Sequence, residues 1–154
     1  MHNIRPAVIE DIDRVAANIR PEHEREAILA GLTGADALRF SFKYAASCYA
    51  FCVGGQAIFI AGAMEPDALD DSALCWMAGT PEMDNHAFPL LNASRYILGK
   101  LHDDSRAHRL ENHVPADYRK AIKFAHWLGC RQGATSVRGG VEHVHIYHDQ
   151  EKSQ

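Results

Sequence analysis

The sequence contains no apolar run near the ~20 residues that a membrane-spanning helix requires. Its first residues also lack a basic segment followed by an apolar one, so we expect no secretory signal. Lysine and arginine occur as scattered pairs, and the formal net charge of the 154 residues is −4, so nucleic acid is not expected as the main partner. We therefore expect a globular protein that neither spans a membrane nor is secreted.

Paired cysteine motifs are missing as well. The four cysteines, Cys48, Cys52, Cys75 and Cys130, form no CxxC pair and lie among apolar residues. This pattern is typical of reduced thiols that pack in a core, and it argues against disulfides and against a zinc site.

Three histidines near the C-terminus, His143, His145 and His148, suggest a metal site, because imidazoles two residues apart on a strand share a face. However, Val144 and Ile146 form the apolar side of the same strand. We therefore expect His143 and His145 to face solvent, and we expect no metal.

The residues that are present suit a single domain, with apolar positions spaced for helices in the N-terminal part. Residues 4–7 form an apolar segment expected to be a strand, and residues 12–19 carry apolar side chains at helical spacing. Pro21 is expected to open a second helix that glycines at 31 and 34 close. A third helix is expected to begin with Asp36 as its N-cap.

The middle of the chain predicts antiparallel strands. Residues 49–53 and 57–63 are rich in strand formers and are separated by Gly54-Gly55, which suits a tight hairpin turn. A polar loop then leads to a third strand over residues 74–77. These segments predict a three-stranded antiparallel core.

The last third predicts a helix that includes residues 88–101, a strand over residues 110–114 and another helix. Asp117 is expected to cap this helix, and Gly129 is expected to take the left-handed conformation at its end. Residues 141–147 form the final strand, and we expect the tail 149–154 to be disordered.

This order resembles the GCN5-related N-acetyltransferase (GNAT) fold. The sharpest local match is AIKFAHWLGC at residues 121–130, which is similar to the recurrent Ala-Ile-x-x-Tyr-x-x-x-Gly-Phe stretch of that fold. The resemblance implies an α/β (α+β) protein, a single GNAT-like domain over residues 1–154 with a mixed, mostly antiparallel central sheet flanked by helices.

Within that fold, the chain resembles the acetyltransferase-like internal virion proteins of T7-like podoviruses. The shared pieces are Ile-Arg-Pro-Ala at 4–7, Ala-Leu-Arg-x-Ser at 37–41, Trp-x-x-Gly-Thr at 76–80, Ser-Arg at 94–95, Asn-x-Val at 112–114 and Trp-Leu-Gly at 127–129. This resemblance implies a phage-encoded protein in the virion or the host cytoplasm. Its implied partners are other phage virion proteins, and an oligomer is compatible with it.

The GNAT resemblance implies acetyl-CoA as a cofactor, with its pyrophosphate held by backbone N–H groups at a helix N-terminus. The matching candidates are Trp76, Gly79, Thr80, Asn85 and His86. In this loop Pro81 removes a donor, and Glu82 and Asp84 place like charge near the phosphates. The loop is therefore expected to be a poor cradle for a pyrophosphate.

The general acid of the GNAT stretch is commonly its tyrosine, and Ala125 occupies that place here. Tyr118, about one helical turn earlier, is a candidate replacement, although it also fits the apolar stripe of its helix. Asn112 and Glu26 are further catalytic candidates, with strand-edge hydrogen bonding and an ordinary salt bridge as their structural alternatives.

Three function hypotheses follow from these residues. The first is a phage-encoded GNAT-fold protein with a degenerate acetyl-CoA site and a protein-binding role. The second is an active acetyl-CoA-dependent N-acyltransferase with a variant pyrophosphate loop. The third is a small-anion binding module that uses Arg20, Arg39 and Arg95, whose alternative role is ordinary ion pairing.

Overall fold

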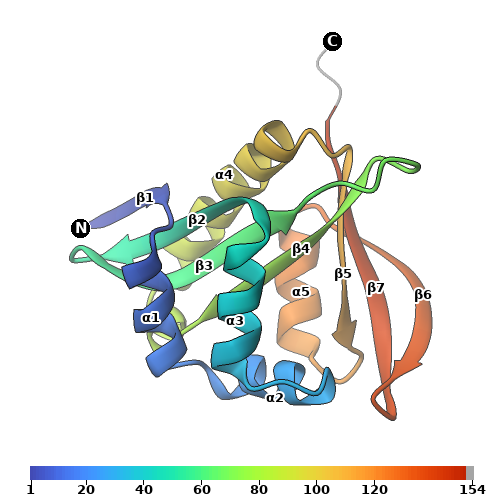
Figure 1. The fold of residues 1–154 in the computed structure, drawn as a ribbon, viewed down its shortest axis with the longest axis horizontal. Helices are drawn as coiled ribbons and strands as arrows, with labels where there is room; N and C mark the ends of the chain where they lie inside the picture. The colour runs from blue at the N-terminus through green and yellow to red at the C-terminus, as the bar shows by residue number, and fades with distance from the viewer. Residues whose placement is uncertain (152–154) are drawn as a thin grey trace.

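The computed structural model describes residues 1–151, which fold into one seven-stranded sheet with helices on both faces (Figure 1). The strand order is β1-β2-β3-β4-β5-β7-β6. The elements in chain order are β1 His2–Pro6, α1 Ile9–Ala17, α2 Pro21–Leu29, α3 Gly34–Lys43, β2 Ala45–Val53, β3 Gln56–Met64, β4 Ser72–Gly79, the 3-10 helix η1 Pro81–Asn85, α4 Ala87–Ser105, β5 Arg109–Pro115, α5 Arg119–Trp127, β6 Arg131–Arg138 and β7 Val141–Asp149. All pairings are antiparallel except that of β4 with β5. The expected mixed, mostly antiparallel sheet is therefore confirmed.

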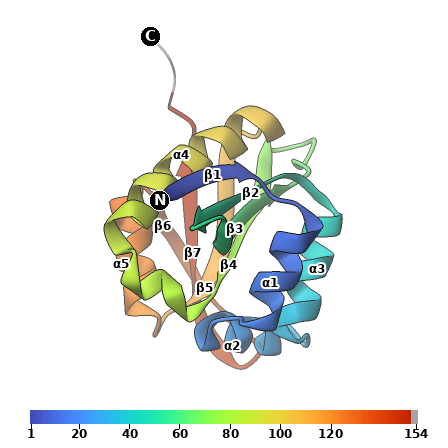
Figure 2. The ribbon, with the colours of Figure 1, turned by 90° about the vertical axis from the view of Figure 1, so that its left-hand side faces the viewer.

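Two apolar layers hold the helices to the sheet. Figure 2 shows α1 and α3 on one side of the sheet and α4 and α5 on the other. Ile12, Val15 and Leu38 pack with the sheet residue Ile60 on the first side. On the second side, Phe51, Phe59, Ile97, Leu101 and Leu110 form the larger cluster. Among the described residues, no helix is both long and apolar enough to cross a membrane.

The glycines predicted at the hairpin turn and at the end of the last helix are confirmed, whereas Gly34, expected to close α2, is the first residue of α3. Gly54 and Gly55 connect β2 to β3 with φ values of 59° and 80°, and Gly129 follows α5 with a φ of 91°. Such angles favour glycine because a Cβ atom is strained there. All four cysteines are free thiols, as expected for packing residues.

Two predicted helix caps are wrong. The N-cap of α3 is Thr33, whose Oγ1 accepts a hydrogen bond from the amide of Asp36 at 3.1 Å, so α3 begins three residues earlier than expected. Asp117 does not cap α5. Its carboxylate instead pairs with Arg25 of α2 at 3.0 Å, and Tyr118 stands at the N-cap without a capping side-chain bond. Tertiary ion pairing has replaced the local cap.

The C-terminal region contains a strand that the sequence did not predict. β6 pairs antiparallel with β7, and Gly139 and Gly140 form the turn between them with φ values of 59° and 76°. The residues of β6 are almost all exposed, so no alternation of apolar and polar residues marks the strand. β6 forms one edge of the sheet.

The expectation that His143 and His145 face solvent is wrong. His143 is only 6% exposed, and its Nδ1 lies 2.8 Å from the carbonyl oxygen of Val141. His145 is partly buried and bonds Glu111 at 2.7 Å. Near the β6–β7 turn, a Cβ atom on Gly139 would lie 2.8 Å from the Leu29 carbonyl oxygen, so the end of α2 approaches the turn closely.

The prediction that a disordered tail begins at residue 149 is wrong for its first two residues. Asp149 is the last residue of β7, and the amide of Gln150 donates to the His108 carbonyl oxygen at 2.7 Å. Residues 152–154 of the expected tail lie outside the described residues.

Candidate functional site

The parallel strands β4 and β5 pair over a short length and then separate. Their register joins Ser72 to Arg109 and ends with Leu74 opposite Glu111. Just beyond, the Asn112 side-chain amide donates to the Cys75 carbonyl oxygen at 2.7 Å and spans the point of separation. Figure 1 shows the two strands diverging, with α5 behind them.

A cavity of about 210 Å³ occupies this separation, and its walls come from both sides of the sheet. α4 contributes Ser94, Ile97, Leu98 and Leu101 on one side, while His23 and Glu26 of α2 line the cavity together with Trp76, Glu111 and Tyr147. A largely apolar cavity with a few polar groups is the usual form of a small-ligand site.

Helix α5 lies over the cavity instead of packing tightly onto the sheet. None of its residues is buried, although its sequence is strongly amphipathic. Its apolar residues Ala121, Phe124 and Ala125 line the cavity. The methyl group of Ala125 is therefore the group that α5 presents where the GNAT stretch has its tyrosine.

Glu26 is the carboxyl group of α2 at this cavity, and burial raises its pKa to about 7. The neighbouring Arg25 opposes this rise and Glu22 adds to it. A carboxyl group that titrates near neutral pH at a cavity wall is suited to general acid or base chemistry. Glu26 is thus the sequence-predicted catalytic candidate that the structure brings to the cavity with a perturbed pKa.

His23 joins α2 to the end of β4. Its Nδ1 accepts a hydrogen bond from the backbone amide of Gly79 at 3.0 Å. Burial, and then the nearby Arg20, lowers the pKa of His23 to about 4, so the ring is neutral near pH 7. No sequence pattern marks this residue, because only the packing of α2 against β4 brings it to Gly79.

Two thiols, Cys75 and Cys130, also line the cavity. Burial raises the pKa of Cys75 to about 12 and that of Cys130 to about 11. Both are therefore protonated near pH 7, and neither is activated as a nucleophile.

The loop expected to hold a pyrophosphate folds as the 3-10 helix η1, and several of its amides are already bonded within the chain. Gly79 donates to His23, Thr80 to the Ile58 carbonyl at 3.0 Å, and Met83 to the Thr80 carbonyl at 3.1 Å. A Cβ atom on Gly79 would lie 2.0 Å from the Met83 sulfur, so the Met83 side chain fills the space beside Gly79. The amides of Gly79, Thr80 and Met83 are therefore already bonded within the chain, and the Met83 side chain lies beside Gly79.

Of the other cofactor candidates, Asn85 and His86 are neighbours at the end of η1, whereas Trp76 lies within β4. Trp76 is 8% exposed and packs in the cluster on the α1 and α3 side, with its indole N–H unpaired among the described residues. His86 precedes α4, and its ring lies 3.3 Å from that of His2. Asn85 is exposed at the end of η1, and only Trp76 of these three lines the cavity.

Tyr118 points away from the cavity. Its hydroxyl donates to the Glu22 carbonyl oxygen at 2.7 Å, and the Arg25 guanidinium lies 5.0 Å from the centre of its ring. Tyr118 is not among the residues that line the cavity. The geometry thus gives it a structural contact between α2 and the start of α5.

The three arginines proposed as an anion site are not brought together. Arg20 pairs with Asp84 at 3.0 Å and also with Glu22. Arg39 pairs with Asp13 at 3.4 Å, and Arg95 donates to the Trp127 carbonyl oxygen at 2.9 Å. Each has its own partner in a different part of the fold, so the anion-binding hypothesis has no common site.

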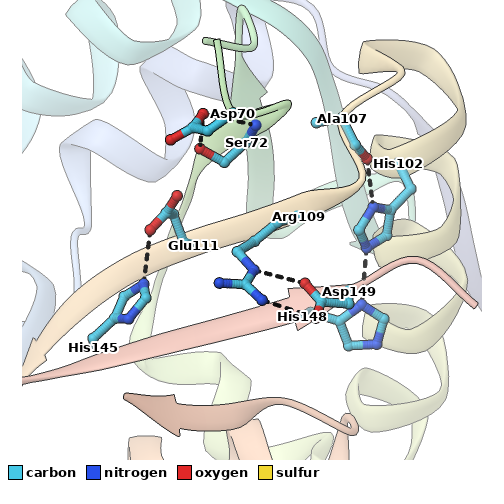
Figure 3. A network of polar contacts seen from close by, with 9 residues as sticks. All are labelled: Asp70, Ser72, His102, Ala107, Arg109, Glu111, His145, His148 and Asp149. Atoms are coloured by element: carbon cyan, nitrogen blue, oxygen red, sulfur yellow. Dashed lines mark hydrogen bonds and ion pairs between the residues drawn. The ribbon is translucent and has the colours of Figure 1, made fainter. Parts of the chain in front are cut away.

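Polar contacts join β5, β7 and α4 beside the part of the cavity that Glu111 and His148 line (Figure 3). Arg109 and Asp149 form a pair at 2.7 Å, and Glu111 bonds His145 at 2.7 Å. His102 donates through Nδ1 to the Ala107 carbonyl at 2.9 Å, so its Nε2 accepts from Nδ1 of His148 at 2.8 Å when both rings are neutral. Among residues 1–151 no three His, Cys, Asp or Glu side chains are grouped to hold a metal ion.

A mixed seven-stranded sheet with separated β4 and β5 strands and helices on both faces is the GNAT acetyltransferase fold. The GNAT domain of PAT from S. lividans is similar over 97% of this chain and 90% of its own, with a TM-score of 0.71 and 15% identity. A spermidine N-acetyltransferase SpeG variant from Vibrio cholerae is similar over 96% and 93%, with a TM-score of 0.71 and 13% identity. A GNAT-family acetyltransferase from Bacillus anthracis has a TM-score of 0.70 over 96% and 94%, also at 13% identity.

At these identities the solved structures establish the fold alone. No family model and no curated protein sequence matches the chain. The expected GNAT fold is therefore confirmed.

Proposed function

We propose that this chain is a phage-encoded GNAT-fold protein of the virion or the infected cell, which binds other phage proteins and does not use acetyl-CoA in the standard way. The observation that carries the proposal is the bond between the Gly79 amide and His23, together with the Met83 side chain beside Gly79. The short motifs between residues 4 and 130 that resemble the podovirus proteins, in the same order along the chain, support the phage origin.

The loop argues against a conventional cofactor because a phosphate would have to displace bonds that the chain already makes. An amide–carbonyl bond contributes only about 1 kcal/mol net, but leaving its partner unpaired costs more. Glu82 and Asp84 add negative charge to the same segment, and only Asp84 has an arginine partner. The loop is thus stable as it is and unfavourable for an anion.

The proton-transfer groups support the same proposal. Ala125 lines the cavity with a methyl group, and the Tyr118 hydroxyl is engaged by the Glu22 carbonyl. α5 therefore presents no hydroxyl that could protonate a departing thiolate.

The direct test is calorimetric titration with acetyl-CoA, with a thiol-release assay on amine substrates run beside it. We expect neither micromolar binding nor turnover. The matched variant is His23→Ala, which frees the Gly79 amide, and Arg39→Gln on α3 is the control. Micromolar binding and turnover by the unaltered protein would overturn the proposal. Mass spectrometry of purified particles of the encoding phage tests the virion location separately.

The second candidate, an active N-acyltransferase, is favoured by one observation, the Glu26 carboxyl with a pKa of about 7 at the cavity. Ionised Glu26 would take a proton from an acceptor amine. Asn112 would keep β4 and β5 in place where they separate, through its hydrogen bond to the Cys75 carbonyl. Solved neighbours include spermidine N-acetyltransferases, which makes spermidine a reasonable first acceptor to test. This candidate predicts activity that rises through about pH 7 and is lost in Glu26→Gln.

Assembly is a further part of the proposal. One solved neighbour is the dodecameric spermidine N-acetyltransferase from Vibrio cholerae. In this chain the edge strand β6 is almost wholly exposed, which leaves it free to pair with another chain. Light scattering of the purified protein tests whether an oligomer forms.

A further inference from the structure

A second cavity, of about 300 Å³, lies where α1 ends, β3 begins and β4 passes into η1. Its lining consists of Arg14, Asn18, Gln56, Ala57, Ile58, Thr80, Pro81 and Glu82. None of these residues lines the cavity between β4 and β5. This second cavity is therefore separate from the cavity between β4 and β5, although Thr80, Pro81 and Glu82 also belong to the loop expected to hold a pyrophosphate. The ligand inferred below does not depend on the proposed function.

Thr80 forms the buried part of this cavity. The residue is 7% exposed, and its own amide donates to the Ile58 carbonyl at 3.0 Å, which fixes its backbone beside β3. Its Oγ1 is buried and has no hydrogen-bond partner among the described residues. Buried hydroxyls are almost always hydrogen-bonded, so an orphan hydroxyl at a cavity wall indicates a partner that the chain itself does not supply.

The rim of the cavity carries one charge of each sign. Arg14 comes from the last turn of α1 and Glu82 from the first turn of η1, and both are exposed. Within residues 1–151 neither side chain takes part in an ion pair, with the other or with any third residue. A ligand with a negative and a positive end would satisfy both charges at once, whereas a simple anion would meet repulsion from Glu82.

The remaining lining residues narrow the class of ligand. Asn18 and Gln56 add carboxamides, which bond to either end of a zwitterion, and Ala57, Ile58 and Pro81 supply apolar contact. The lining contains no aromatic ring that a sugar would stack on. The cavity volume is at the lower end of the range for small-molecule sites, about 300–1,000 Å³.

We infer that this cavity binds a small zwitterion of the amino-acid class. The ligand carboxylate accepts hydrogen bonds from the Arg14 guanidinium and the Thr80 hydroxyl, and the ligand ammonium pairs with Glu82. The apolar residues contact the ligand side chain.

The test uses the full chain in thermal-shift and calorimetric titrations with each standard amino acid in turn. Any amino acid that binds is compared with its des-amino acid, which lacks the ammonium, and with its methyl ester, which lacks the carboxylate. We expect at least one amino acid to bind and both analogues to bind at least about 10-fold more weakly.

Variants assign the contacts. Thr80→Val keeps the shape and removes the orphan hydroxyl, so the ligand-free protein should unfold at the same or a higher temperature while the affinity falls about 10-fold. Thr80→Ser should retain binding. Arg14→Gln should abolish binding, and Arg39→Gln, which removes an exposed charge on α3, should leave it unchanged.

Glu82→Gln should abolish the preference for the amino acid over its des-amino analogue, while Glu65→Gln, at an exposed position in the β3–β4 loop, should not. Absence of amino-acid binding up to ~10 mM would overturn the inference. Binding that neither Thr80→Val nor Arg14→Gln weakens would overturn it as well, as would selective binding of a neutral sugar.

Discussion

The backbone amide of Gly79 donates a hydrogen bond to Nδ1 of His23 at 3.0 Å, and this bond links the end of β4 to the first turn of α2. Because the acceptor is a ring nitrogen, the bond requires the imidazole to be unprotonated at Nδ1. The same contact therefore removes a donor from the expected pyrophosphate loop and makes the packing of α2 sensitive to pH.

The first prediction concerns the stability of His23→Gln as a function of pH. The pKa of His23 is about 4 in the folded chain and 6.5 for an ordinary histidine, so the unfolded chain binds the proton more readily. The His23 contribution to stability is thus present above pH 6.5 and is lost as the pH falls towards 4. At about 1.4 kcal/mol per pKa unit, the loss is on the order of 3 kcal/mol.

Urea unfolding at a series of pH values measures this contribution by comparing the wild type with His23→Gln. The wild type should lose stability relative to His23→Gln as the pH falls through that window, because a glutamine oxygen still accepts from Gly79 but does not titrate. His108→Gln, at an exposed position before β5, is the control and should follow the wild type. A constant difference across the window would contradict the prediction.

The second prediction concerns Glu26, whose shift has the opposite sign. Its pKa is raised from 4.5 to about 7, so the folded chain binds the proton more readily than the unfolded chain. The contribution of protonated Glu26 to the free energy of unfolding is fully present below pH 4.5 and is lost as the pH rises through 7. Glu26→Gln removes this penalty and should be more stable than the wild type above pH 7, by up to about 3 kcal/mol.

The measurement is again urea unfolding, with Glu10→Gln at an exposed site of α1 as the control. Between pH 4.5 and 6.5 the two effects oppose each other in the wild type, so its stability should change little. With rising pH, the free energy of unfolding should fall in His23→Gln, where only Glu26 titrates. It should rise in Glu26→Gln, where only His23 titrates. Parallel profiles for the two variants would show that these groups do not titrate as described.

The third prediction distinguishes two N-caps of α3. Thr33 accepts from the Asp36 amide at 3.1 Å, so Thr33→Ala should lower the free energy of unfolding by about 1 kcal/mol. Thr33→Ser should keep the cap. Asp36→Asn should have a smaller effect, since that side chain is not the cap. Chemical denaturation of the three variants checks the order, and a larger loss in Asp36→Asn would reverse the assignment.

The cap of α3 illustrates how far the sequence determines the fold. Periodicity and glycine turns predicted the helices and the β2–β3 hairpin, because those signals depend on neighbours in the chain. Thr33 and Asp36 are both good caps by composition, and only the start of the helix decides between them. β6 was missed because its side chains are exposed on an edge strand, so pairing with β7 alone defines it.

The candidate site was predictable to a smaller extent. Glu26 and Trp76 were identified from the resemblance and do line the cavity between β4 and β5. His23 was not identified. Tyr118 was a candidate general acid, with a place in the apolar stripe of its helix as the alternative, and its hydroxyl contacts the Glu22 carbonyl. Both differences depend on how α2 packs against β4 and α5, and no local sequence pattern encodes that packing.

The last prediction compares two glycines, Gly99 within α4 and Gly129 at the end of α5. Gly129 ends α5 with a φ of 91°, and a Cβ atom there would make only ordinary contacts, the nearest at 3.6 Å to the His148 ring. The cost of Gly129→Ala is therefore in the backbone, about 1–2 kcal/mol of lost stability. Gly99 lies within α4 with open space around a Cβ atom, so Gly99→Ala should gain up to about 1 kcal/mol. Thermal unfolding of the two variants should shift the midpoint in opposite directions, and a gain in Gly129→Ala would contradict the left-handed end of α5.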